Sequence, residues 1–305
     1  MLDNERYNLA KRALLNIYLH KAYGTSDQET FEWILSEHYH TQLALESLGA
    51  NARTHPVEIR GINQTILPNE RPRGKRKPLA IHVIGMPKTL KTTMRKAIEQ
   101  IGDRRIGRKE IRISTQTETA GALHRIYEQK FGEVLDFEEF LMSQVMANTI
   151  ELKLESLYSK KSRCYSVLIN RGPIDIIPFT WANFLFGRLS QDKFQRAVTN
   201  IQTGLRPLED FQNAIILLLV TPEESLRRNQ ESGNPQGRVM NPKFLPFLYE
   251  QYLKLHWQLM DSDGRRPWSG EEIPYACLDM SGQRIRGALE RYTAAWANIL
   301  KFYFG

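Results

Sequence analysis

Apolar and polar positions follow two different patterns along the chain. Residues 4–23 carry apolar side chains at intervals of three and four, which predicts a helix, and a second pattern of this kind begins at Asp27. Residues 51–78 lose that periodicity and end in a run rich in proline, glycine and positive charge, which is typical of a linker. We therefore predict a helical extension with a basic linker over residues 1–77 and a separate domain over residues 78–305.

Short apolar runs alternate with helical patterns throughout that second part of the chain. Five of these runs predict strands, namely Leu79–Ile84, Glu110–Ser114, Cys164–Ile169, Ala214–Val220 and Tyr275–Asp279. Strands that are almost wholly apolar and alternate with helices predict a parallel sheet covered on both faces. Right-handed crossovers bring the carboxyl ends of such strands to one edge of the sheet, where ligands bind. We therefore expect an α/β domain with a five-stranded parallel sheet.

The composition is that of a soluble globular protein. Of the 305 residues, 41% are hydrophobic, which argues against a disordered chain. Two cysteines are too few for a disulfide scaffold, and no apolar run approaches the roughly 18–20 residues that a membrane-spanning helix needs. We expect a cytoplasmic protein without a membrane contact. The formal net charge of +8 is compatible with phosphate-bearing ligands and with nucleic acid, and does not choose between them.

The clearest chemical signal lies between the first predicted strand and the next predicted helix. From Gly85 onward, this segment matches the phosphate-loop pattern of Gly, four residues, Gly, Lys and Ser or Thr, except that Leu90 replaces the second glycine. In such a loop, backbone N–H groups bind anions, Lys91 neutralises terminal phosphates, and the Thr92 hydroxyl holds Mg²⁺. A turn with solvated lysines is the alternative. We favour a nucleotide site whose predicted contacts are Gly85, Pro87, Lys88, Thr89, Leu90, Lys91, Thr92 and Thr93.

Polar side chains also follow the second and third predicted strands. Glu118 is placed to accept a proton from an attacking hydroxyl or to help hold Mg²⁺, although a plain capping turn explains it equally well. Arg171 comes directly after the third strand, where its guanidinium matches phosphate oxygens. Asp175 falls in the first turn after Pro173, so it is either functional or a carboxylate that stabilises the start of a helix.

Two helical segments supply the remaining candidates. Gln144 lies four residues from both Phe140 and Asn148, so two amides on one helical face could read the edge of a base, or could simply satisfy backbone groups. Arg227, Arg228 and Arg238 lie on either side of a segment rich in glycine, asparagine and proline, which suits a closing lid that carries cations. A solvated basic face is the alternative for the arginines.

The order of these segments resembles that of a known family. Residues 79 to about 300 are similar to the phosphate-loop nucleoside and nucleotide kinases, in particular to the deoxynucleoside kinase and thymidylate kinase group. The segments that carry the resemblance are Gly85 to Thr93, Thr117-Glu118, Phe140 to Gln144, Asn170-Arg171-Gly172, Thr221 to Arg228, and the Asp-x-Ser-Gly turn at Asp279 to Gly282. The chain departs from the family at Leu90, which replaces glycine, and at Asn170, which replaces an acidic residue.

The resemblance implies a three-layer phosphate-loop NTPase fold with strand order 2-3-1-4-5 and transfer of the γ-phosphoryl group of ATP to a nucleoside, a nucleotide or a similar small hydroxyl acceptor. It further implies that Mg²⁺ takes part and that Thr92 binds it. In this reading the catalytic residues are Lys91, Glu118, Arg171, Arg227 and Arg238, and the acceptor-binding residues are Gln144 and Asp175.

Two other functions remain open at this point. Leu90 and Asn170 favour a catalytically weak or inactive nucleotide-binding protein that acts as a regulator or scaffold. The basic linker and a pI near 9.4 suggest a kinase that acts on nucleic-acid ends, which we favour less. We also expect that the N-terminal helices could join copies of the chain into a homo-oligomer.

Overall fold

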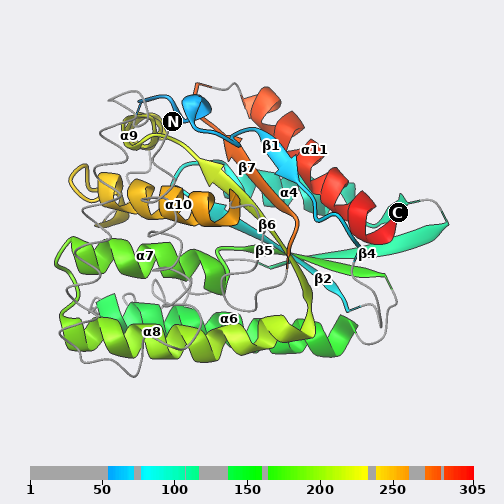
Figure 1. Cartoon of the computed structure of the whole chain (residues 1–305), viewed down its shortest axis with the longest axis horizontal. Coiled ribbons are helices and arrows are strands. Elements are labelled where there is room, and N and C mark those ends of the chain that lie inside the picture. Colours follow the sequence, from blue (N-terminus) through cyan, green and yellow to red (C-terminus); the bar gives the residue numbers. More distant parts are fainter. Residues whose placement is uncertain are drawn as a thin grey trace.

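The computed structural model describes residues 54–71, 77–106, 108–116, 137–159, 164–232, 238–260, 272–282 and 285–305. Within these residues, seven strands form one sheet in the order β1-β7-β6-β2-β5-β4-β3 (Figure 1). The strands are β1 (Gln64–Ile66), β2 (Leu79–Gly85), β3 (Arg104–Ile106), β4 (Lys109–Gln116), β5 (Tyr165–Asn170), β6 (Gln212–Leu219) and β7 (Tyr275–Asp279).

The expected sheet of five parallel strands is wrong in extent. The strands β4, β5, β2, β6 and β7 are parallel neighbours in the expected order, but β1 pairs antiparallel with β7 and β3 pairs antiparallel with β4. The sheet is therefore mixed. Both added strands have only three residues, and their sequences, Gln-Thr-Ile and Arg-Arg-Ile, lack the apolar run that marks a central strand.

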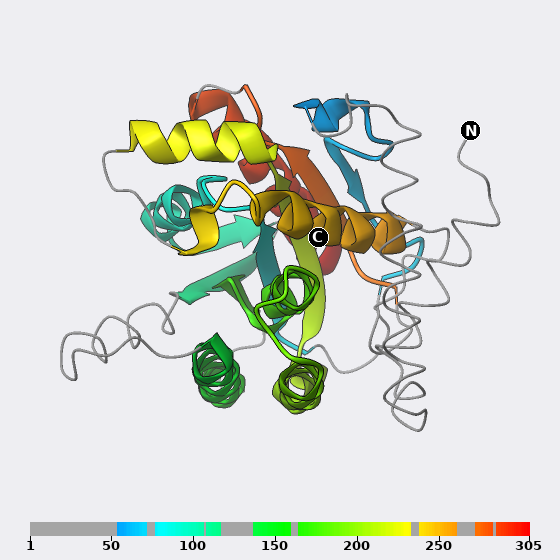
Figure 2. The same cartoon turned by 90° about the vertical axis from the view of Figure 1, so that its left-hand side faces the viewer.

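Helices cover both faces of the sheet, so the domain has three layers (Figure 2). One apolar core joins one face of the sheet to α6, α7, α8 and α10, and a second core joins the other face to α4 and α11. The helices are α4 (Lys91–Ile101), α6 (Phe137–Ser159), α7 (Pro173–Leu185), α8 (Gln191–Leu205), α9 (Pro222–Glu231), α10 (Leu245–Met260) and α11 (Ile285–Phe304), with 3₁₀ turns at η2 (Pro56–Glu58), η3 (Arg206–Asp210) and η4 (Arg238–Met240). The described part of the chain includes no helix with the length and hydropathy to cross a membrane.

The central strand β2 places the phosphate-loop segment at the carboxyl edge of the sheet. All seven of its residues are buried, and it lies between β5 and β6. Its one titratable side chain, His82, is fully buried and meets Asn213 Oδ1 through Nε2 at 3.1 Å. Because β2 ends at Gly85 and β5 ends at Asn170, the segments that follow these strands start side by side.

Residues before the linker also join this sheet. β1 extends it beyond β7, and the Asn63 side-chain oxygen accepts a hydrogen bond from the Asp279 N–H at 3.0 Å. On α10, the Nε2–H of His256 donates to the Arg60 carbonyl oxygen at 2.8 Å, and the Tyr275 hydroxyl donates to Nδ1 at 2.7 Å. The domain boundary near residue 77 stays a prediction. The helices expected over 4–23 and from Asp27, and the oligomer that they could form, lie outside the described residues.

Candidate functional site

The phosphate loop leaves β2 at a position that only glycine can occupy. Gly85 has a φ of 130°, and a Cβ atom there would lie 2.0 Å from the carbonyl oxygen of Leu218 on β6. The next residue, Met86, donates its N–H to that same oxygen at 3.1 Å. The start of the loop is thus held against the neighbouring strand.

Leu90 keeps the backbone shape that the missing glycine would have. Its φ of 65° and ψ of 17° place it in the left-handed region immediately before α4. Its side chain is half-buried and packs against the apolar core that contains α4 and α11. That packing offsets a backbone cost of about 1–2 kcal/mol. The replacement of glycine by Leu90 therefore leaves the form of the loop intact.

Lys91 lies inside the loop that precedes it. Its ammonium group donates to the carbonyl oxygens of Gly85 at 2.5 Å and Met86 at 2.7 Å, and lies 3.2 Å from the Thr89 hydroxyl. The side chain of Lys91 is buried, whereas Thr92 and Thr93 are exposed in the first turn of α4. A buried ammonium beside the unpaired N–H groups of a helix N-terminus is an arrangement that binds anions.

The helix α9 contacts the phosphate loop through Ser225, which no motif marked, and through Arg228, one of the arginines expected in a lid. The Ser225 hydroxyl donates to the Pro87 carbonyl at 2.9 Å, and the Arg228 guanidinium donates to the Lys88 carbonyl at 3.2 Å. Arg228 also donates to the carbonyl of Met280, directly after β7. Partial burial lowers the pKa of Lys88 below its ordinary value, and its ammonium group lies 3.0 Å from the Ser232 hydroxyl.

The arginines expected in a lid occupy different places. Arg227 forms ion pairs with Glu224 and Glu231 on its own helix, and its side chain is half-exposed. These carboxylates, above all Glu224, raise the pKa of Arg227. Arg238 begins the short turn η4, and its side chain is outside the described part of the structure, as is the whole of Glu118. Among the described side chains of this region, Arg228 reaches the phosphate loop.

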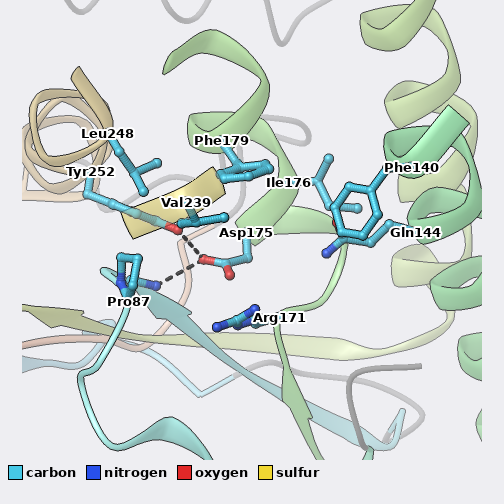
Figure 3. Close-up of a pocket in the computed structure, with 11 residues that line it drawn as sticks. Pro87, Phe140, Gln144, Arg171, Asp175, Ile176, Phe179, Val239, Leu248 and Tyr252 are labelled. Atoms are coloured by element: carbon cyan, nitrogen blue, oxygen red, sulfur yellow. Dashed lines mark hydrogen bonds between the residues drawn. The ribbon is translucent and has the colours of Figure 1, made fainter. Parts of the chain in front are cut away.

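A cleft opens beside the phosphate loop, with about 550 Å³ of space that is partly open to solvent. Figure 3 shows Asp175 in the middle of it, between Tyr252 and Pro87 on one side and Phe140 and Gln144 on the other. Its walls come from the loop, the end of β5, α6, α7, η4 and α10. The lining residues are Gly85, Pro87, Phe140, Gln144, Arg171, Asp175, Ile176, Phe179, Val239, Leu248 and Tyr252.

Asp175 connects the cleft to the phosphate loop. One of its carboxylate oxygens, Oδ1, accepts hydrogen bonds from the Gly85 N–H at 2.9 Å and from the Tyr252 hydroxyl at 2.7 Å. Burial and the nearby carboxylate raise the pKa of Tyr252 well above its ordinary value, so the phenol remains a donor. Asp175 itself is only 7% exposed.

The residues that follow β5 meet Asp175 in the cleft. Arg171 has a φ of 57°, its N–H donates to the Val83 carbonyl at 3.2 Å, and its own carbonyl accepts from the Asn148 amide at 3.4 Å. The side-chain oxygen of Asn170 is buried and has no hydrogen-bond partner among the described residues. Gln144 is buried and lines the wall opposite Tyr252 (Figure 3).

The structure thus brings together some of the predicted side chains and adds several that no motif marked. Two loop residues, Gly85 and Pro87, line one cleft with Gln144, Arg171 and Asp175. Phe179, Val239, Leu248 and Tyr252 complete it, and only Tyr252 among these has a polar group. A tyrosine on an apolar helix such as α10 is expected to be an ordinary core residue. The sequence holds no signal that distinguishes Tyr252 from the other core residues of this helix.

Comparison with known proteins adds a likeness in fold. No family model and no curated protein matches the chain. Among solved structures, the deoxyadenosine kinase of M. mycoides with bound dATP is 13% identical, covers 71% of this chain and 98% of its own, and has a TM-score of 0.49. The thymidylate kinase of Candida albicans is 15% identical, covers 74% of this chain and 94% of its own, and has a TM-score of 0.46. These are members of the kinase group that the motifs resemble.

Proposed function

We propose that the protein is an ATP-dependent phosphotransferase whose acceptor is a nucleoside, a nucleotide or a similar small hydroxyl compound. The observation that carries this proposal is the phosphate loop, which has the required backbone at Gly85 and Leu90 and holds Lys91 inside it. A cleft with one carboxylate and one guanidinium adjoins the loop. Donor phosphates and acceptor would therefore meet at the carboxyl edge of the sheet.

The loop fits the polyphosphate of ATP. Lys91 already lies within hydrogen-bond distance of loop carbonyls, and phosphate oxygens would replace these as its partners. The N–H groups of the first turn of α4 would donate to the same phosphates. Arg171 lines the cleft next to the loop, and there its guanidinium would stabilise charge on the transferring group.

The described residues also fit Mg²⁺. Thr92 exposes its hydroxyl at the end of the loop, and Asn170 offers a buried side-chain oxygen that has no described partner. Mg²⁺ prefers oxygen ligands and takes most of them from phosphates and water, so two neutral oxygens suffice on the protein side. When bound, the ion would neutralise charge on the β- and γ-phosphates.

The acceptor would lie between Asp175 and Gln144. Phe140 and Phe179 offer aromatic surface to a planar ring, and the Gln144 amide offers both a donor and an acceptor to its edge. Glu118 remains the proposed proton acceptor for the attacking hydroxyl, and Arg227 and Arg238 remain candidates for a cation that joins the site on closure.

The proposal is tested by titrating ATP and Mg²⁺ into the protein and into Lys91→Ala, and by measuring turnover with a panel of nucleosides and nucleotides. Loss of the Lys91 ammonium should lower turnover by roughly a thousandfold or more, because its charge acts where phosphate charge develops. Lys96→Ala is the matched control, since Lys96 is exposed on the same helix, more than one turn after Lys91. Equal turnover in wild type and Lys91→Ala would defeat the proposal.

One observation favours a second function. The strand β5 ends in Asn170, so a neutral amide stands at the end of this strand, where the kinases that the motifs resemble have an acidic residue. A nucleotide-binding regulator or scaffold would need only the phosphate loop. Binding of ATP without phosphoryl transfer to any member of the panel would favour that function.

A further inference from the structure

The strand pair at one side of the sheet is strongly basic. Residues 104–112, which include β3 and the start of β4, carry four arginines and one lysine against a single carboxylate, Glu110. β4 pairs with β5 only from Arg112 onward, whereas β3 pairs with the residues of β4 that precede it. The pair therefore extends beyond its neighbours at the amino edge of the sheet, as Figure 1 shows for β4. We call residues 104–112 the basic hairpin.

The two faces of the basic hairpin differ in character. Ile106 and Ile111 pack on the apolar core that contains α4 and α11. Because side chains alternate along a strand, Arg105 and Arg112 lie on the opposite face. Both are exposed, as is Arg108 in the turn, and the three guanidinium groups form no ion pair or hydrogen bond with a described residue. The hairpin thus presents positive charge on the face that the core does not use.

Contacts with the rest of the domain hold the basic hairpin in place. The ammonium group of Lys109 donates to the carbonyl oxygen of Phe304 at 2.5 Å, in the last turn of α11. At the base of the hairpin, the Ile113 N–H donates to Asp103 Oδ1 at 3.0 Å. These contacts and the apolar face fix the direction in which the arginines project, so little backbone freedom is lost when a ligand binds.

From this placement we infer that the basic hairpin binds the phosphate backbone of duplex DNA. Arg105 lies opposite Glu110 and therefore diagonal to Arg112, which places the two arginines roughly 7–8 Å apart on one face. Guanidinium groups at this spacing contact separate phosphates of one strand. Glu110 shares the face, and the three arginines outweigh its charge. A two-stranded ribbon fits the major groove of B-form DNA, whereas the major groove of duplex RNA is too narrow.

Other anionic ligands fit the basic hairpin less well. Residues 104–112 contain no aromatic side chain, and sites for single strands rely on aromatic rings on which bases stack. Its isoleucines face the core, so the outer face offers no apolar anchor for a lipid surface. The hairpin lies at the amino edge of the sheet and the cleft at the carboxyl edge, so this inference does not depend on the proposed function.

The test measures binding of a short DNA duplex of mixed sequence to the full-length protein by fluorescence anisotropy, between about 50 and 200 mM salt. The logarithm of the wild-type affinity should fall linearly with the logarithm of the salt concentration, because phosphate contacts release bound cations. In the double variant Arg105→Ala, Arg112→Ala, the affinity at low salt should fall by about tenfold or more. The slope should decrease by about 2, one for each lost contact.

The double variant Arg60→Ala, Arg286→Ala is the matched control. It removes the same charge from exposed arginines away from the hairpin, one just before β1 at the other side of the sheet and one in the first turn of α11. Both variants keep the basic linker, so its contribution cancels in the comparison. The control should bind DNA nearly as tightly as wild type does.

Three results would overturn the inference: failure of wild type to bind duplex DNA at low salt, equal losses of affinity in the two double variants, or tighter binding of duplex RNA or single-stranded DNA than of duplex DNA. Equal melting temperatures of wild type and both variants, measured by circular dichroism, check that a loss of binding does not come from unfolding. ATP binding should be the same in all three proteins, since the hairpin is remote from the phosphate loop.

Discussion

The phosphate loop and the acceptor cleft lie side by side but are built in opposite ways. The loop is a single run of residues whose function depends on backbone conformation at Gly85 and Leu90. The cleft is assembled from Arg171, directly after β5, and from side chains of α6, α7, η4 and α10, so its proposed function would depend on charge and shape. A site formed by one continuous segment keeps its geometry when residues elsewhere are substituted. A site assembled from several elements depends on how the helices that carry it pack.

This difference predicts two kinds of mutational effect. Changes in the loop should affect binding of every nucleotide donor and the stability of the domain, because the loop begins inside the central strand. Changes in the cleft should affect mainly the acceptor. The following variants test this distinction, from the largest expected effect to the smallest.

Replacing Gly85 by alanine should give the largest loss of stability. The added Cβ would lie 2.0 Å from the Leu218 carbonyl oxygen on a residue with a φ of 130°, so the start of the loop must move. We expect a decrease of roughly 3 kcal/mol or more in the free energy of unfolding, measured with urea. Gly102→Ala is the control, because Gly102 also has positive φ but nothing lies within 4 Å of its Cβ position. Its expected cost is about 1 kcal/mol.

The folded domain should lose stability at acidic pH because of a histidine on α10, the helix that forms one wall of the cleft. His256 lies one turn from Tyr252, and burial lowers its pKa from 6.5 to about 4. A proton binds this imidazole more readily in the unfolded chain, so stability should fall as the pH drops from about 6.5 to about 4. The loss should approach about 3 kcal/mol at the lower end.

Urea unfolding across this pH range measures the effect. In His256→Gln the decline between pH 6.5 and 4 should shrink, since no imidazole is left to titrate there. A wild-type unfolding free energy that stays constant over the range would contradict the assignment of a buried, neutral His256.

The two adjacent arginines of α9 should differ in their effect on ATP. Arg228 reaches the carbonyl of Lys88 in the phosphate loop, whereas Arg227 pairs with carboxylates on the exposed side of its helix. Arg228→Ala should weaken ATP binding by roughly tenfold, because hydrogen bonds from a charged group hold the loop against α9. Arg227→Ala should weaken ATP binding by much less. Equal losses in the two variants would show that Arg227 also enters the site.

Sequence alone was sufficient for the parts of this molecule that a short segment determines. Four of the five parallel strands appear as apolar runs and β4 as a weaker pattern, and the loop residues from Gly85 to Thr93 stand in the expected place. Arg171 and Asp175 were found because they follow the end of a buried strand. In each case a local pattern fixes the position of the side chain relative to the sheet edge.

Features that depend on distant partners were missed. β1 and β3 are too short and too polar to be recognised as strands from the sequence, and they form only because a neighbouring strand offers an open edge. Tyr252 looks like an ordinary core aromatic, and its contact with Asp175 follows from the packing of α10. Arg228 was expected in a lid, but its hydrogen bond to the Lys88 carbonyl follows from the packing of α9. The conformation of Leu90 could be expected from the motif, but the apolar support beneath it could not.

The strand β1 has a practical consequence for anyone who wishes to isolate the part of the chain that carries the phosphate loop. A fragment cut at residue 77 would strip the outermost strand from β7 and leave a row of backbone donors and acceptors facing water. It would also deprive His256 of its carbonyl partner on Arg60. Such a fragment would be prone to self-association through the bared edge, so a minimal soluble version should begin before Thr54 rather than after the basic linker.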